Sequence, residues 1–188
     1  MMQHPIRIAV FVFLSLLLVL LSGNFFFFHP SSSSSSQQNN KMAFQVVLRE
    51  GITGGFAGPT IKQVVDIQGD NSGASITQAT LKPQSKTDYH TQTGGVSAEQ
   101  LSSLLDLLKQ ELQALPTEDP VGSEDIYGQD ISLSFFSDDF QWSNGGPEGC
   151  SQGESSTKAS DEQKEKFKEI VQIVKGLGDQ YAVTVAAE

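Results

Sequence analysis

The sequence has a single cysteine, Cys150, and three histidines, of which only His90 follows residue 41. One cysteine excludes a disulfide within the chain and leaves the thiol free, buried or paired with another chain. No Cys-x-x-Cys or His-x-x-x-His spacing occurs, so the usual zinc-binding patterns are missing. Cys150 has acidic neighbours and no histidine nearby in the sequence, which disfavours a reactive thiolate. We therefore expect no catalytic residue, no metal site and no cofactor.

Basic residues are scarce as well. All 22 Asp and Glu residues follow residue 41, whereas Arg7 and Lys41 are two of the 12 basic residues. Ten Lys and Arg thus face 22 acidic residues in the rest of the chain, a net charge of about −12. Such a charge repels a phosphate backbone, so we expect no binding to nucleic acid.

The N-terminal segment is apolar. Arg7 precedes the run IAVFVFLSLLLVLL at 8–21, and the small residues SGN follow, which is the order of a secretory signal peptide. The sequence FFFF at 25–28 lengthens the apolar stretch enough for an uncleaved membrane anchor. Residues 1–24 are therefore interpreted as a signal peptide or a signal anchor. If the segment is cleaved, we expect a secreted protein. If it is not cleaved, we expect a protein held on a membrane through this segment alone, with its domain outside the cytosol.

Residues 25–41 continue as an apolar stretch and then as the low-complexity sequence SSSSSSQQNN, which is typical of a flexible linker. The remaining residues, 42–188, are long enough for one domain with a single core.

The first part of this domain favours strands. Residues 42–50 and 60–68 are rich in β-branched and apolar residues, and the short glycine-rich stretch between them predicts a hairpin. A weaker strand is predicted at 76–84. Residues 84–95 are polar and are expected to form a loop.

Two helices are predicted from leucine and valine spacing. Residues 96–116 place leucines on one face, and Ser97 with Gln100 forms a capping box. A second helix is predicted from Asp161 to Gly176, with a capping box of Ser160 and Gln163 and an end at the glycines.

Between and after the helices, the sequence predicts further strands and loops. Strands are predicted at 130–136 and 139–143, an acidic loop at 116–125, and an exposed loop at 144–160. The acidic loop lacks EF-hand spacing and is expected to be a solvated surface. The tail YAVTVAAE is expected to add an edge strand or to fray. The order β-β-(β)-α-β-β-α predicts an α+β fold, an antiparallel sheet of four to five strands with two amphipathic helices packed on one face.

The stretch GITGGFAGPT at 51–60 has more glycine than a hairpin turn requires, and Phe56 lies in its middle. It is not a phosphate-binding loop, because it lacks the Lys-Ser/Thr pair and no helix follows it. Two interpretations stay open. Phe56 either folds back onto the core as a plug, or it contacts a partner while the glycines permit close backbone approach.

The motif GGFAG after a first strand resembles that of the emfourin-like family, small proteins that inhibit thermolysin-like zinc metallopeptidases such as protealysin. The order of a hairpin, a leucine-rich helix, an aromatic strand pair and a C-terminal helix is similar over most of residues 43–178, whereas 69–95 and 144–160 look like insertions.

The resemblance implies a non-enzymatic inhibitor whose partner is a thermolysin-like metallopeptidase. It also implies that the partner-binding residues are Gly54, Gly55, Phe56, Ala57 and Gly58. The alternative from composition alone is a structural or protein-interaction domain of unknown partner displayed outside the cytosol.

Overall fold

The computed structural model describes residues 44–52, 60–145 and 153–185. The chain divides into two units, Met1–Asn39 and Asn40–Glu188, and every described residue belongs to the second. The predicted signal or anchor segment and the linker lie outside the described residues. Within the described residues, no helix is long and apolar enough to cross a membrane.

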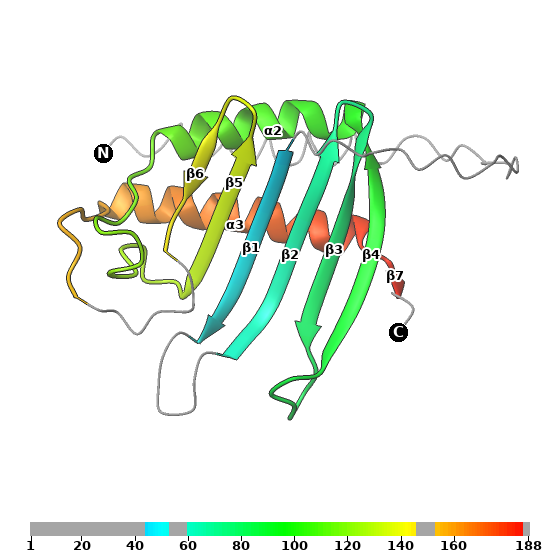
Figure 1. Ribbon diagram of the computed structural model, residues 1–188, viewed down its shortest axis with the longest axis horizontal. Helices are drawn as coiled ribbons and strands as arrows, with labels where there is room; N and C mark the ends of the chain where they lie inside the picture. The colour runs from blue at the N-terminus through cyan, green and yellow to red at the C-terminus, as the bar shows by residue number, and fades with distance from the viewer. Residues whose placement is uncertain (1–43, 53–59, 146–152, 186–188) are drawn as a thin grey trace, which may run out of the picture. The chain divides into compact units, whose positions relative to one another are not determined.

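The described residues form an α+β fold, as predicted (Figure 1). All strand pairings are antiparallel, and the sheet order is β6-β5-β1-β2-β3-β4-β7. The elements are β1 (Phe44–Ile52), β2 (Thr60–Asp70), β3 (Gly73–Leu81), β4 (Tyr89–Ser97), α2 (Ala98–Gln113), β5 (Ile131–Ser137), β6 (Gln141–Ser143), α3 (Asp161–Tyr181) and β7 (Thr184–Val185). The sheet therefore has seven strands, more than the four to five expected.

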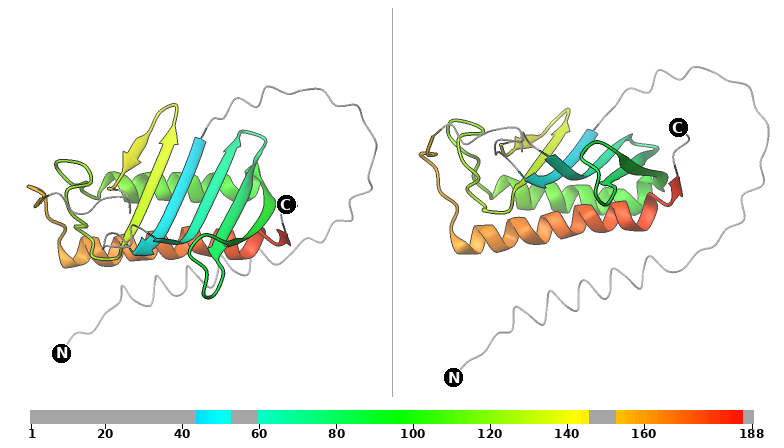
Figure 2. Two further views of the ribbon diagram at one scale, coloured as in Figure 1. Left: turned by 60° about the horizontal axis from the view of Figure 1, so that its bottom comes forward. Right: turned by 90° about the horizontal axis from the view of Figure 1, so that it is seen from below.

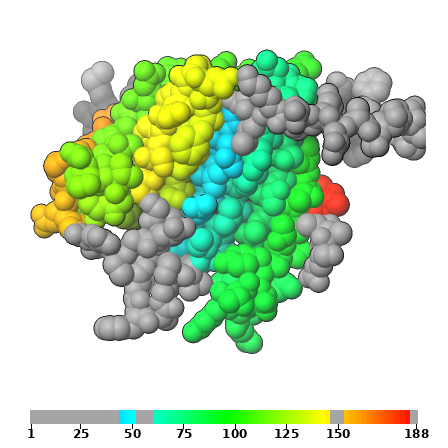
Figure 3. Space-filling model, in the orientation of Figure 1, coloured from blue at the N-terminus to red at the C-terminus, as the bar shows by residue number. Residues whose placement is uncertain are grey.

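Both helices cover the same face of the sheet, as the two views in Figure 2 show. Alternate residues of the strands point toward them, because successive side chains of a strand lie on opposite faces. The core combines these strand residues with the apolar stripes of the helices, for example Val46 and Leu48 of β1, Leu108 of α2, and Phe167 and Val174 of α3. Each such side chain contributes about 1.5–3 kcal/mol through burial. The other face of the sheet is seen in Figure 3.

The helix starts agree with the sequence, whereas the helix ends do not: α2 ends at Gln113, before the predicted Pro116. The hydroxyls of Ser97 and Ser160 accept the N–H groups of Gln100 and Gln163, and both capping boxes are complete. The prediction that α3 ends at Gly176 is wrong, since the helix continues to Tyr181.

Gly178 serves close packing instead of helix termination. A Cβ atom at this position would lie 3.2 Å from side-chain atoms of Val65 and Gln78, so the helix approaches the sheet closely here. The Gln78 side chain also donates a hydrogen bond to Asp179 Oδ1 at 2.8 Å. Packing against β2 and β3 therefore outweighs the low helix propensity of glycine.

The prediction of a loop over 84–95 is also wrong for most of its length. Residues 89–97 form β4, which pairs with β3 from Gly73↔Ser97 to Leu81↔Tyr89. A Cβ atom on Gly94 would lie 1.7 Å from the carbonyl oxygen of Tyr181, so the end of α3 crosses the strand where it has no side chain. The tail adds the short edge strand β7, one of the two outcomes expected for it.

The described part of 144–160 is a loop, as expected, and most of its residues are exposed or half-buried, but two are not; residues 146–152, with Cys150, lie outside the described residues. Asn144 and Ser155 are buried. The Asn144 side chain completes the outer edge of β5 beyond β6: its Oδ1 accepts the Leu133 N–H at 2.7 Å, and its Nδ2 donates to the Ile131 carbonyl at 2.8 Å.

Candidate functional site

The five residues that the resemblance implies as partner-binding, 54–58, lie within 53–59 and so outside the described residues. Their flanks are described. β1 and β2 are antiparallel neighbours whose register ends at Ile52↔Thr60. The predicted hairpin is therefore confirmed, and residues 53–59 are the connection between its two strands.

The β1 side of this connection is held at two adjacent residues. The Gly51 N–H donates to the carbonyl of Asp130 at 3.1 Å, and the Glu50 carboxylate forms an ion pair with Lys175 of α3 at 2.5 Å. The register with β2 shifts between Glu50 and Gly51. Because such an irregularity bends a strand locally, it sets the direction in which β1 leaves the sheet.

The β2 side is held by the neighbouring hairpin. The phenolic O–H of Tyr89, the first residue of β4, donates to the Ile61 carbonyl at 2.7 Å. β4 is two positions from β2 in the sheet, so this bond reaches across β3 to the start of β2. Both ends of 53–59 thus leave the sheet from backbone that is fixed by tertiary contacts.

The registers place the connections 53–59 and 82–88 and the last residues of 114–130 at one end of the sheet, the lower edge in Figure 1, whereas the rest of 114–130 runs along the left side of the sheet from the end of α2. β1 ends where β5 begins, as Glu50↔Ile131 shows, and β3 ends where β4 begins, as Leu81↔Tyr89 shows. We call the segments 53–59, 82–88 and 114–130 the loop end of the sheet. Functional residues concentrate on loops that a rigid scaffold positions, which makes the loop end the candidate functional region.

Segment 114–130 is folded by its own polar groups. The Asp125 carboxylate accepts the N–H groups of Tyr127, Gly128 and Asp130 at 3.1, 2.9 and 2.7 Å. The Tyr127 ring stacks on Phe167 with 4.1 Å between ring centroids, and its hydroxyl donates to the Pro116 carbonyl at 2.5 Å. Burial raises the pKa of Tyr127, so this hydroxyl stays a donor.

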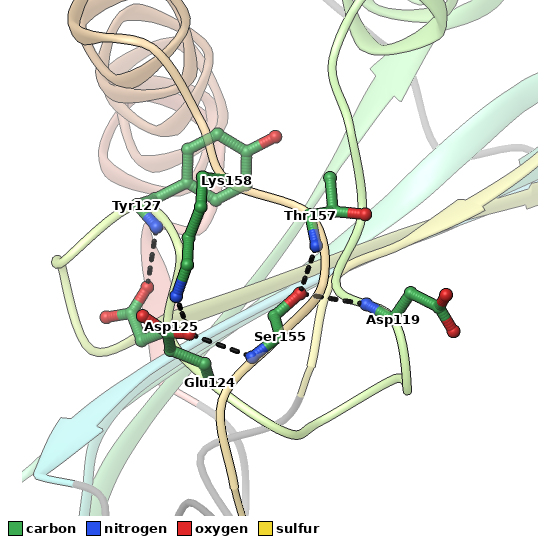
Figure 4. A network of polar contacts seen from close by, with 7 residues as sticks. All are labelled: Asp119, Glu124, Asp125, Tyr127, Ser155, Thr157 and Lys158. Carbon is green, nitrogen blue, oxygen red and sulfur yellow. Dashed lines mark hydrogen bonds and ion pairs between the residues drawn. The ribbon is translucent and has the colours of Figure 1, made fainter.

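A polar network joins this segment to residues 155–158 (Figure 4). The Ser155 hydroxyl accepts the N–H groups of Asp119 and Thr157, each at 3.0 Å. The Ser155 N–H donates to Glu124 Oε2 at 2.9 Å, and Lys158 pairs with the same oxygen at 2.5 Å. Apart from the bond between Thr157 and Ser155, these contacts link residues more than 30 positions apart in the chain. No local sequence pattern predicts these contacts. The only signal in the sequence is that both segments are rich in Ser and acidic residues.

Glu118 is not part of a solvated acidic surface, contrary to expectation, because only 2% of the residue is exposed. Its carboxylate accepts the Gly145 N–H at 2.7 Å. Burial raises the pKa of Glu118, while its hydrogen bonds to backbone N–H groups, including that of Gly145, oppose the shift. The acidic segment therefore uses Glu118, Glu124 and Asp125 to hold backbone and side-chain donors.

Over the described ranges, no group of three or more His, Cys, Asp and Glu side chains is arranged to hold a metal ion. His90 lies on β4, not in a loop, and its side chain is exposed.

Comparison of the chain with protein-family models, with curated proteins and with solved structures finds no match. The resemblance to the emfourin-like family therefore stays a prediction.

Proposed function

We propose that the protein is a non-enzymatic binding module that inhibits a thermolysin-like zinc metallopeptidase through residues 54–58. The observation that supports this proposal is the fixed base of the connection 53–59. Its β1 flank is held by Asp130 and Lys175, and its β2 flank is held by Tyr89.

A fixed base favours tight binding by a short loop. Ordering a flexible segment on binding makes the binding free energy less favourable. A scaffold that already restricts the ends of the segment reduces this cost. Peptidases bind substrates as extended chains, so an inhibitor has to offer a backbone that approaches closely together with one anchoring side chain. The connection contains three glycines and a single aromatic residue, Phe56, which supply both.

The charged groups at the loop end are consistent with a binding role instead of a catalytic one. Glu124 is paired with Lys158, and Asp125 accepts three backbone N–H groups. These carboxylates stabilise the conformation of segment 114–130. We further propose that the protein acts outside the cytosol, either secreted or anchored by residues 1–24, which the apolar run at 8–21 supports.

Peptide hydrolysis by a thermolysin-like peptidase in the presence of the purified chain tests this proposal. We expect inhibition with Kd of about 1 µM or lower, competitive with the peptide substrate, since the loop occupies the substrate cleft. Full peptidase activity at protein concentrations well above this range would contradict the proposal. That result would favour the alternative, a structural or protein-interaction domain that binds a different partner.

A further inference from the structure

Three lysines of the described residues have no carboxylate partner among those residues, and all three lie at one place in the fold. Nine lysines follow residue 43 in the sequence. Six of them form ion pairs with Asp or Glu side chains. The other three are exposed and form no ion pair with another described residue; they are Lys62, Lys82 and Lys86.

These lysines lie in and beside the turn between β3 and β4. Residues 82–88 join the two strands and contain Lys82 and Lys86. The register of β2 with β3 reaches Gln63, so Lys62, the next residue of β2, lies beside the end of β3 from which the turn begins. Figure 3 shows the turn in green at the lower edge of the molecule, where it projects from the sheet. We call the three lysines the cationic surface.

The backbone of this turn is held by its own hydrogen bonds. The Lys82 N–H donates to the Asp88 carbonyl at 2.8 Å, and the Ser85 N–H donates to the Lys82 carbonyl at 3.1 Å. The Ser85 hydroxyl accepts the N–H groups of Thr87 and Asp88 at 3.2 and 2.8 Å. The turn therefore presents its lysines from a fixed backbone, which reduces the entropy that binding would cost.

The cationic surface lies in a part of the domain that is poor in carboxylates. Residues 73–97, which form β3, the turn and β4, contain one of the 22 acidic residues of the chain, Asp88. Three lysines and one aspartate give a local charge of +2, whereas residues 42–188 together carry about −12. The unpaired positive charge of an acidic domain is thus concentrated on one turn and the strand end beside it.

A small positive surface on an acidic domain discriminates among anionic partners by their size. A nucleic acid or a membrane with anionic lipids extends far beyond the turn, so it is repelled by the net charge of the whole domain. A short acidic peptide avoids most of this repulsion, since charges more than about 10 Å away are largely screened at an ionic strength of about 0.1 M. Neighbouring strands lie about 4.8 Å apart, so a short peptide can contact the end of β2 and the turn together.

We propose that Lys62, Lys82 and Lys86 form a docking surface for a short, carboxylate-rich segment of a partner protein. The three ammonium groups pair with the carboxylates of that segment. This inference is independent of the proposed inhibition of a peptidase, because it requires no contact with residues 53–59.

The experiment follows the binding of a fluorescently labelled octaglutamate peptide to the full chain by fluorescence anisotropy. The test variant neutralises the cationic surface with Lys62→Gln, Lys82→Gln and Lys86→Gln. The control variant neutralises three lysines of α3 with Lys164→Gln, Lys166→Gln and Lys168→Gln. Both variants lose the same charge, but the control lysines are paired with carboxylates and lie outside the cationic surface. Thermal unfolding of each variant verifies that it is folded.

We expect the wild type to bind the peptide with a Kd of about 0.1 mM or lower at an ionic strength of about 0.1 M, and more weakly as salt is added. The test variant should bind at least about fivefold more weakly, and the control variant should stay within about twofold of the wild type. Arginine at the same three positions of the cationic surface keeps the charge and should retain binding.

Three results would overturn the proposal. The first is a wild type that does not bind the peptide. The second is equal weakening in the test and control variants, because the net charge of the domain then explains the loss. The third is binding of the wild type to vesicles that contain phosphatidylserine without binding to octaglutamate, because the cationic surface then recognises a membrane and not a peptide.

Discussion

The ammonium group of Lys175 lies 2.5 Å from the Glu50 carboxylate, which connects the C-terminal half of α3 to β1 just before the chain enters residues 53–59. The two side chains are only 20% and 27% exposed, so solvent screens the pair less than a typical surface ion pair. The pair therefore helps to fix where the proposed inhibitory loop leaves the sheet.

Lys175→Met tests this anchoring role, with Lys166→Met as its control. Lys166 is also on α3 and pairs with Glu111 of α2 at 2.9 Å, not with a residue of β1 or β2. We expect each substitution to lower the unfolding free energy by about 0.5–1 kcal/mol, as measured by urea denaturation. Only Lys175→Met should also raise the inhibition constant, by about threefold, because only it loosens the base of 53–59. Equal inhibition constants for the two variants would contradict the anchoring role.

The strengths and failures of the sequence prediction have physical reasons. The helix starts were predictable, since Ser97 with Gln100 and Ser160 with Gln163 are local signals that the structure confirms. The strands with clear apolar alternation were predictable for the same reason. β4 was missed because its sequence, YHTQTGGVS, is polar, and because its Gly94 is required by the carbonyl of Tyr181, a contact distant in sequence.

The candidate site was predictable only in part. That residues 53–59 join two paired strands followed from the sequence pattern, whereas the contacts of Asp130, Lys175 and Tyr89 with their flanks did not. These contacts depend on tertiary placement, which composition does not encode locally. The fixed conformation of segment 114–130 was missed for the same reason: an acidic segment with Pro and Gly has the same pattern whether or not Ser155 holds it.

Asn144 stabilises the outer edge of β5, and its removal should be costly. Asn144→Ala leaves the Leu133 N–H and the Ile131 carbonyl without these side-chain partners. Each unpaired buried group costs about 1–3 kcal/mol, so we expect a loss of at least about 2 kcal/mol in unfolding free energy by urea denaturation.

Ser134→Ala is the control for Asn144→Ala, since it removes only the half-buried hydroxyl contact between Ser134 and Ser143 of the same strand pair. Its loss should be about 1 kcal/mol or smaller. A loss for Asn144→Ala no larger than that for Ser134→Ala would contradict the role of Asn144 at this edge.

Glu118 and Glu124 should make opposite contributions to the pH dependence of stability. Burial raises the pKa of Glu118 above 4.5 in the folded protein, so the protonated form stabilises the fold. That stabilisation is complete below pH 4.5 and is lost as pH rises through the folded pKa. Glu118→Gln cannot ionise, and its unfolding free energy should therefore rise relative to that of the wild type as pH increases over this window.

Glu124→Gln, in the same segment, should change the pH dependence of the unfolding free energy in the opposite direction. The hydrogen bond from Lys158, followed by that from Ser155, lowers the pKa of Glu124 below 4.5. Its stabilisation is present above pH 4.5 and is lost as pH falls through the folded pKa. The unfolding free energy of Glu124→Gln should thus fall relative to that of the wild type as pH increases. Urea denaturation across this pH range measures both differences, and equal slopes for the two variants would contradict the assignment.

The most direct test of the central claim compares Phe56→Ala with Phe136→Ala as inhibitors of a thermolysin-like peptidase. Phe136 is a matched control, because it is an exposed phenylalanine, at 43%, on β5 and outside the loop end. If Phe56 anchors the loop in the peptidase, Phe56→Ala raises the inhibition constant by about 30-fold or more, and Phe136→Ala changes it by less than about twofold. An inhibiting wild type whose Phe56→Ala variant inhibits equally well would contradict the assignment of residues 54–58 as the partner-binding site.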